Sequence, residues 1–207
     1  MTPTFASHPA VKTGTRTPHD ALRRNVIDMA LGFTATMRVF EQRSKATIAN
    51  LLAEHLLNAQ NTSSKEAFEA VHESFCMQFI TKVRVAERHL KNGSVRSAAS
   101  ASYGHAAKMF DVCAKVWFYY CHMPDQDTAT RITPYLHAAI DTPILKRLKS
   151  LPDHKVTAST LSGIDQGTYR ALQTLAARDQ VDTYPTATMM VHYDDLVWSE
   201  LSREEAY

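Results

Sequence analysis

Residues 103–122 read YGHAAKMFDVCAKVWFYYCH, and this stretch decides the fold class. Its apolar side chains recur at intervals of three and four, which places them on one face of an α-helix. That face carries Met109, Val112, Cys113, Val116, Trp117 and Tyr120. The pattern predicts a helix that has these residues in the core of the protein.

Helical periodicity continues outward in both directions. It predicts further helices over residues 18–42, 44–59, 64–91, 127–139, 165–177 and 191–202, and one that begins at Pro143. The chain has six glycines in 207 residues, whereas sheet sandwiches and nucleotide-binding α/β folds use glycine at their turns and phosphate loops. We therefore predict an all-α protein, a single compact domain of about seven to nine helices.

The domain boundaries follow from composition. Residues 1–17 are rich in Thr and Pro and lack apolar periodicity, so we predict a flexible N-terminal arm and a single helical domain over residues 18–207. Hydrophobic residues make up 44% of the chain and charged residues 21%, which is typical of a folded protein and excludes a disordered one.

The cysteines and the hydropathy of the sequence indicate in which cellular compartment the protein is expected. The three cysteines form no C-x-x-C pair and lie in apolar helical stretches, as reduced thiols do, so we expect a cytoplasmic protein. We expect neither a membrane span nor a secretory signal, because the sequence has no apolar run of about 18 residues and residues 1–18 have no apolar centre.

Charge is unevenly distributed although the formal net charge is only +2. Residues 82–96 hold five basic side chains and one acidic one, residues 146–155 hold four and one, and the tail from residue 194 is acidic. Such basic stretches are either solvated helix faces or phosphate contacts. If they contact nucleic acid, we expect the binding residues to be Arg84, Arg88, Lys91, Arg96, Lys115, Lys146, Arg147 and Lys149.

Common catalytic motifs are absent from the sequence. It contains no P-loop, no G-x-S-x-G, no dinucleotide-binding glycine motif and no H-E-x-x-H. We therefore expect no cofactor and no metal site.

One constellation points to chemistry. The segment GHAAKMFDVCAKVWFYY, residues 104–120, is followed by AIDTPIL, residues 139–145, so that Asp141 comes 33 residues after Lys108. Residues 104–148 resemble the core of helix-hairpin-helix DNA glycosylases, most of all the archaeal 8-oxoguanine type. The resemblance implies a helix-hairpin-helix centre, Lys108 as the Schiff-base lysine and Asp141 as the catalytic aspartate. The sequence departs from the family in having one hairpin glycine, Gly104, and no hairpin proline.

The chemistry that the resemblance implies is coherent. A neutral lysine amine attacks C1′ of the sugar after the base leaves, and a carboxylate at a helix start accepts the amine proton. The aromatic side chains of residues 117–120 would stack on an extruded base.

Ordinary helix anatomy explains the same residues separately. Asp111 and Lys115 have the spacing of a helix ion pair, Lys108 would face solvent, and Asp141 would cap the helix that begins at Pro143.

Two functions of different classes therefore remain. The first is a DNA-associated protein, either a base-excision glycosylase or abasic-site lyase or a non-catalytic relative that binds DNA. The second is a non-enzymatic interaction or regulatory protein with a protein partner. Its surface would be the acidic C-terminal helix, whose apolar stripe is Val191, Leu196, Val197, Trp198 and Leu201. A small-molecule enzyme using His105 or His122 with Asp141 has no spacing argument behind it.

Overall fold

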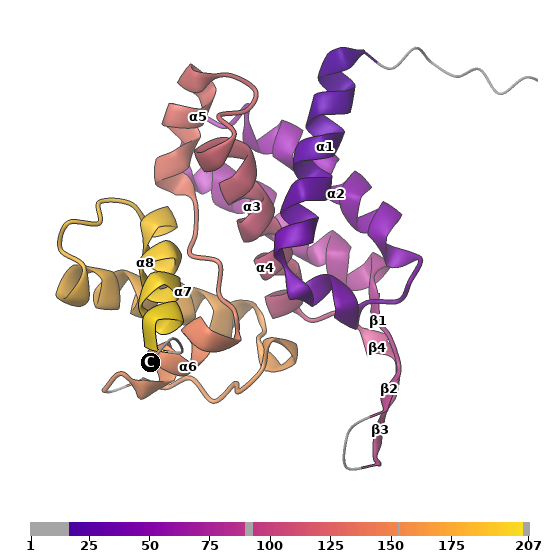
Figure 1. The fold of residues 1–207 in the computed structure, drawn as a ribbon, viewed down its shortest axis with the longest axis vertical. Helices are drawn as coiled ribbons and strands as arrows, with labels where there is room; N and C mark the ends of the chain where they lie inside the picture. The colour runs from indigo at the N-terminus through magenta and orange to yellow at the C-terminus, as the bar shows by residue number, and fades with distance from the viewer. Residues whose placement is uncertain (1–16, 90–92, 153, 205–207) are drawn as a thin grey trace, which may run out of the picture.

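Eight α-helices make up most of the described part of the chain (Figure 1). The computed structural model describes residues 17–89, 93–152 and 154–204. The helices are α1 (Pro18–Phe33), α2 (Ser44–Ala59), α3 (Lys65–Lys82), α4 (Tyr103–Ala114), α5 (Gln126–Ile132), α6 (Thr142–Ser150), α7 (Gln166–Thr183) and α8 (Met190–Glu204). The predicted compact all-α domain is confirmed. The predicted arm lies outside the described residues, apart from Thr17.

Four shorter helical elements join these helices. They are the 3₁₀ turns η1 (Ala35–Val39), η3 (Thr133–Tyr135) and η4 (Leu161–Gly163), and the π-helical turn η2 (Lys115–Tyr120). The predicted helix over residues 103–122 is therefore α4 continued by η2. Because π-helical hydrogen bonds span five residues instead of four, the side chains of η2 leave the α-helical phase. Tyr120, predicted in the core, is 51% exposed for this reason, whereas Trp117 is buried as predicted.

Side-chain caps set the beginnings of the helices. Thr17 forms a capping box with Asp20 at the start of α1, with Pro18 in the first turn. The cap of α3 is Ser64, whose Oγ accepts from the amide of Ala67 at 3.2 Å. Helix α3 therefore begins at Lys65, one residue later than predicted.

A β-ribbon replaces the last part of the helix that was predicted over residues 64–91. Helix α3 ends at Lys82, and the ribbon consists of β1 (Arg84–Val85), β2 (Arg88–His89), β3 (Val95–Arg96) and β4 (Ala99–Ser100). The strands pair antiparallel, β1 with β4 and β2 with β3. The valines at 83, 85 and 95 favour extended backbone, and Gly93, with a φ of +81°, adopts a conformation that turns require.

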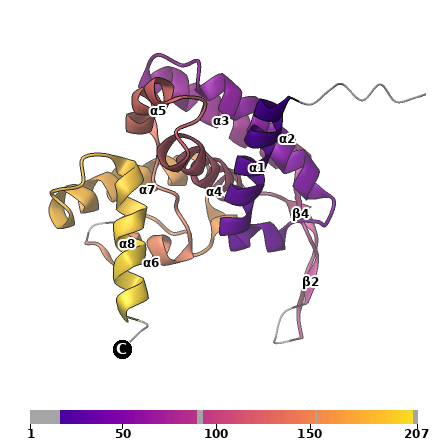
Figure 2. The same cartoon turned by 45° about the horizontal axis from the view of Figure 1, so that its top comes forward.

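The ribbon projects from the helical body in both views (Figures 1 and 2). Its last strand, β4, leads directly into α4, so the element that precedes the helix of Lys108 is a strand. The helix-hairpin-helix centre implied by the family resemblance is therefore not the observed topology.

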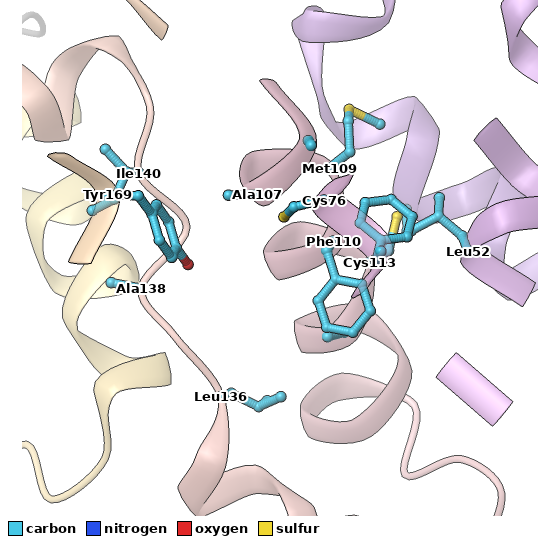
Figure 3. Packing of buried hydrophobic residues seen from close by; sticks show 14 of the residues in the cluster. Leu52, Cys76, Ala107, Met109, Phe110, Cys113, Leu136, Ala138, Ile140 and Tyr169 are labelled. Carbon is cyan, nitrogen blue, oxygen red and sulfur yellow. The ribbon is translucent and has the colours of Figure 1, made fainter. Parts of the chain in front are cut away.

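Helix α4 lies at the centre of the core. It contacts α1, α3 and α7, and ten of its residues are buried. Figure 3 shows Met109, Phe110 and Cys113 of α4 beside Cys76 of α3. The ring of Tyr169 enters the same core from α7. Beyond this centre, α6, α7 and α8 contact one another and form a second group of helices (Figure 1).

None of the helices in residues 17–89, 93–152 and 154–204 has both the length and the apolar character that crossing a bilayer requires.

Gly104 allows η4 to approach the first turn of α4. Its amide donates to the carbonyl oxygen of Ile164 at 3.0 Å. A Cβ atom at this position would lie 2.6 Å from both Ile164 Cβ and the Leu161 carbonyl oxygen. The backbone of η4 would have to move to accept it.

We expect Gly104→Ala to lower the free energy of unfolding by ~1–3 kcal/mol, the usual cost of overpacking a core. Gly163→Ala is the matched control, because its nearest neighbour would lie 3.7 Å away in ordinary contact. Urea denaturation of both variants measures the difference. Equal stability of the two variants would contradict the steric account.

Candidate functional site

Lys108 and Asp141 meet in the structure. Lys108 Nζ donates to Asp141 Oδ2 over 3.1 Å, and the side chains are only 13% and 7% exposed. The expectation that Lys108 simply faces solvent is therefore wrong. Lys108 lies in the middle of α4 and not at its start, so the pair joins the central helix to the beginning of α6.

Asp141 has two roles in this geometry. Its Oδ1 accepts from the backbone amide of Ile144 at 3.1 Å and caps α6, while Oδ2 faces the lysine. The predicted capping role of Asp141 is confirmed. The cap holds the carboxylate in place and adds the favourable field of a helix N-terminus.

A cavity of about 560 Å³ contains this ion pair. Lys108 and Asp141 line it together with a second lysine–carboxylate pair, Lys115 and Asp194. Three large aromatic side chains with substantial exposure also line it, which are Phe33 (70%), Tyr120 (51%) and Trp198 (45%). The arrangement combines an amine, a carboxylate and exposed ring faces in one concave site.

Lys115 is buried and fully engaged with α8. Its Nζ lies 2.9 Å from Asp194 Oδ1 and 2.6 Å from Asp195 Oδ1, and Asp195 also accepts from the Tyr120 hydroxyl at 2.7 Å. Burial raises the pKa of Asp194 to about 6, and the Lys115 ammonium opposes that rise. This setting gives Lys115 a structural role in place of the expected phosphate contact.

The predicted ion pair between Asp111 and Lys115 is not formed. Lys115 pairs with α8, and Asp111 accepts hydrogen bonds from side chains of α3 and α7. Lys115 and Asp111 thus each contact partners in other elements and not each other.

The first basic stretch becomes the exposed part of the ribbon. Arg88 of β2 stands directly opposite Arg96 of β3, and both are exposed. Arg84 lies at the base, where its Nε is 3.6 Å from Glu41 Oε1. Lys91 lies outside the described residues. Like charges that face each other across a strand pair are destabilising unless an anion neutralises them.

The second basic stretch serves mostly to hold α6 in place. Arg147 Nε lies 2.6 Å from Asp179 Oδ2, and its Nη1 lies 3.2 Å from Glu200 Oε2, so it joins α6 to α7 and α8. The hydrogen bond with Asp179 raises the pKa of Arg147 above its ordinary value. Lys149 donates to Ser159 Oγ at 2.9 Å, and Lys146 is exposed.

The apolar stripe of α8 is largely used inside the molecule. Val191 and Val197 are buried, Leu196 and Leu201 are half-buried, and Trp198 lines the cavity. The surface that the interaction-protein hypothesis relied on is therefore mostly covered by the protein itself.

A second polar cluster, which no sequence pattern predicted, is formed by His72, Asp111, His137 and Tyr169. His72 Nε2 lies 3.1 Å from Asp111 Oδ1, and the Tyr169 hydroxyl donates to Asp111 Oδ2 at 2.8 Å. His137 Nδ1 lies 2.9 Å from the same hydroxyl. These residues come from α3, α4, the segment after η3, and α7, so no local spacing connects them.

Burial dominates the electrostatics of this cluster. It lowers the pKa of His72 and of His137 to about 4, and it raises the pKa of Asp111 to about 7. Near neutral pH both imidazoles are therefore uncharged, the form in which histidine accepts a proton or binds a metal.

We expect Lys115→Met to lower the free energy of unfolding by ~3–5 kcal/mol, because it leaves the carboxylate of Asp194 buried without its cation. The double variant Lys115→Met with Asp194→Leu is expected to recover most of this loss, since both charges are then gone. Thermal and urea denaturation measure the three proteins. A double variant no more stable than the single one would show that the buried pair is not the cause.

Comparisons with protein-family models, with curated proteins and with solved structures found no match for this chain. Function is therefore inferred from the geometry of the site. The principal feature is a lysine and an aspartate that meet in a cavity with exposed aromatic walls, on a body that carries an arginine-bearing ribbon.

Proposed function

We propose that this protein binds DNA through its β-ribbon and takes an extruded or abasic nucleotide into the Lys108 cavity. In its catalytic form it is a lyase, or a glycosylase with lyase activity, in which Lys108 is the Schiff-base amine. The observation that carries the proposal is the 3.1 Å contact between Lys108 Nζ and Asp141 Oδ2 inside a cavity of about 560 Å³.

The first step is proton transfer from the Lys108 ammonium to Asp141, which the hydrogen bond between them provides directly. The neutral amine then attacks the C1′ aldehyde of a ring-opened abasic sugar. The carbinolamine takes the proton back from Asp141 and loses water, which leaves an iminium and restores the carboxylate. Asp141 next accepts a C2′ proton while the 3′-phosphate leaves, and water finally hydrolyses the iminium and frees Lys108.

The walls of the cavity suit a nucleotide. Phe33, Tyr120 and Trp198 expose ring area that would otherwise favour burial, and stacking of a base on such rings contributes ~1–3 kcal/mol per base. An extruded base would stack there while its sugar reaches Lys108.

The ribbon suits the duplex. A two-stranded antiparallel ribbon is one of the few elements that the major groove admits. The facing pair of Arg88 and Arg96 concentrates positive charge on it, and a phosphate between the two guanidiniums would relieve their repulsion. The interaction-protein alternative has less support, because the stripe of α8 is mostly packed within the described part of the chain.

We expect borohydride to trap the wild-type protein covalently on duplex DNA that contains an abasic site. Lys108→Ala should abolish trapping, because the amine that forms the iminium is gone. Lys45→Ala, which removes an exposed lysine of α2, is the matched control and should trap normally. Asp141→Asn retains a capping side chain and should slow trapping by about 100-fold or more, since it removes the proton acceptor. Trapping by Lys108→Ala at the wild-type rate would end the catalytic proposal.

We expect the double variant Arg88→Ala with Arg96→Ala to bind duplex DNA more weakly and with a smaller salt dependence. Each phosphate contact contributes ~0.9 to the slope of log K against log salt concentration, so the slope should fall by about 2. Arg178→Ala, which removes an exposed arginine of α7, is the control. Fluorescence anisotropy over a salt series measures the slopes, and an unchanged slope in the double variant would exclude the ribbon as the contact surface.

A further inference from the structure

The buried cluster lies at a second cavity, distinct from the one around Lys108. His72, His137 and Tyr169 line a cavity of about 390 Å³, and Asp111 of α4 is hydrogen-bonded to His72 and Tyr169. Glu69 and Glu73 line the same cavity. The cluster is thus reachable from outside, through a cavity whose walls carry carboxylates that attract cations.

The donor atoms have the spacing of a small metal site. One ligand atom each from His72, Asp111 and His137 lies within 4.8 Å of the others. The Tyr169 hydroxyl is 2.8 Å from Asp111, 2.9 Å from His137 and 3.3 Å from His72. Tetrahedral Zn²⁺ with ligands at ~2.0–2.1 Å keeps neighbouring donors about 3.3 Å apart, so small side-chain movements suffice to admit an ion.

We propose that His72, Asp111 and His137 bind a divalent first-row transition-metal ion, with Zn²⁺ as the simplest case, and that Tyr169 takes the fourth position. Two imidazoles and one carboxylate are a ligand set that zinc and non-haem iron both accept. The site is independent of the proposed DNA chemistry, because it shares no residue with the Lys108 cavity.

Charge balance favours a cation at this place. Within the part of the chain that the structure describes, Asp111 has no lysine or arginine in an ion pair, although it is buried. A buried carboxylate without a full positive charge is costly.

The groups that contact the His72 ring could orient it as the neighbours of metal-binding histidines do. His72 Nδ1 lies 3.8 Å from Cys76 Sγ, one turn further along α3, and this contact fixes the ring with Nε2 toward the cluster. The His72 ring also stacks on the Tyr169 ring, with centroids 5.2 Å apart. Such partners orient ligating histidines and are a regular part of metal sites.

The test is a titration of metal-stripped protein with Co²⁺, followed by visible absorption and by the thermal unfolding temperature. We expect one equivalent of Co²⁺ to bind with a tetrahedral spectrum, Zn²⁺ to displace it, and either ion to raise the unfolding temperature, because the ion joins four segments of the chain. His137→Gln and Asp111→Asn should each weaken binding by more than about 100-fold, since loss of an outer-layer partner alone costs 10–100-fold. Tyr169→Phe should bind Co²⁺ with an altered spectrum, and an unaltered one would remove Tyr169 from the ligand set.

The control is His192→Gln, which removes a histidine of similar half-burial on α8 and should bind as the wild type does. Far-UV circular dichroism shows whether each variant is folded, and His137→Gln, outside any helix, is the variant least prone to unfold. Absence of a tetrahedral Co²⁺ spectrum, or equal binding by wild type, His137→Gln and Asp111→Asn, would overturn the metal site. Neither result would affect borohydride trapping at Lys108.

Discussion

The structure depends on the pairing of three charged side chains that are buried along α4 and its continuation η2. Lys108 and Asp111 of α4 and Lys115 of η2 all lie inside the protein, where an unpaired charge is strongly destabilising. Their partners at the start of α6, on α7 and on α8 belong to the second group of helices, and Asp111 also contacts His72 of α3. Apolar packing tolerates small shifts between helices, whereas these contacts fix one arrangement, so the three pairs set how the C-terminal helices sit against the N-terminal ones.

Helical periodicity was sufficient to predict the class of the fold, because the apolar face of residues 103–122 is a local property of the sequence. It failed at residues 84–89, the part of the predicted helix over residues 64–91 that forms β1 and β2, because pairing with distant strands decides the structure there. It failed again at Tyr120, since a π-helical turn is not visible in the spacing of apolar residues. The meeting of Lys108 with Asp141 was predicted through a family resemblance, not through any local rule.

The histidine cluster, in contrast, could not be predicted from the sequence. His72, Asp111, His137 and Tyr169 are separated by 39, 26 and 32 positions along the chain and have no common motif. His72 and His137 also belong to the aromatic core, where their rings contact Phe110 and Phe68. Only the crossing of α3, α4 and α7 brings their polar atoms together, and that crossing follows from the packing of whole helices. A site that is assembled in this way can be found in the structure but cannot be predicted from the spacing of residues in the sequence.

The proposed mechanism requires Asp141 both to accept the proton of Lys108 and to stay in position. An ion pair stabilises the ammonium form, which cannot attack a carbonyl, so a lysine held only by a carboxylate would be inert. Here Asp141 is also held by the Ile144 amide, which donates to Oδ1, while Oδ2 faces the lysine. In the proposed steps Oδ2 carries the proton while Lys108 is an uncharged amine, and formation of the iminium restores the carboxylate beside a positive charge. The helix start thus holds the carboxylate in position through the steps in which the lysine changes charge.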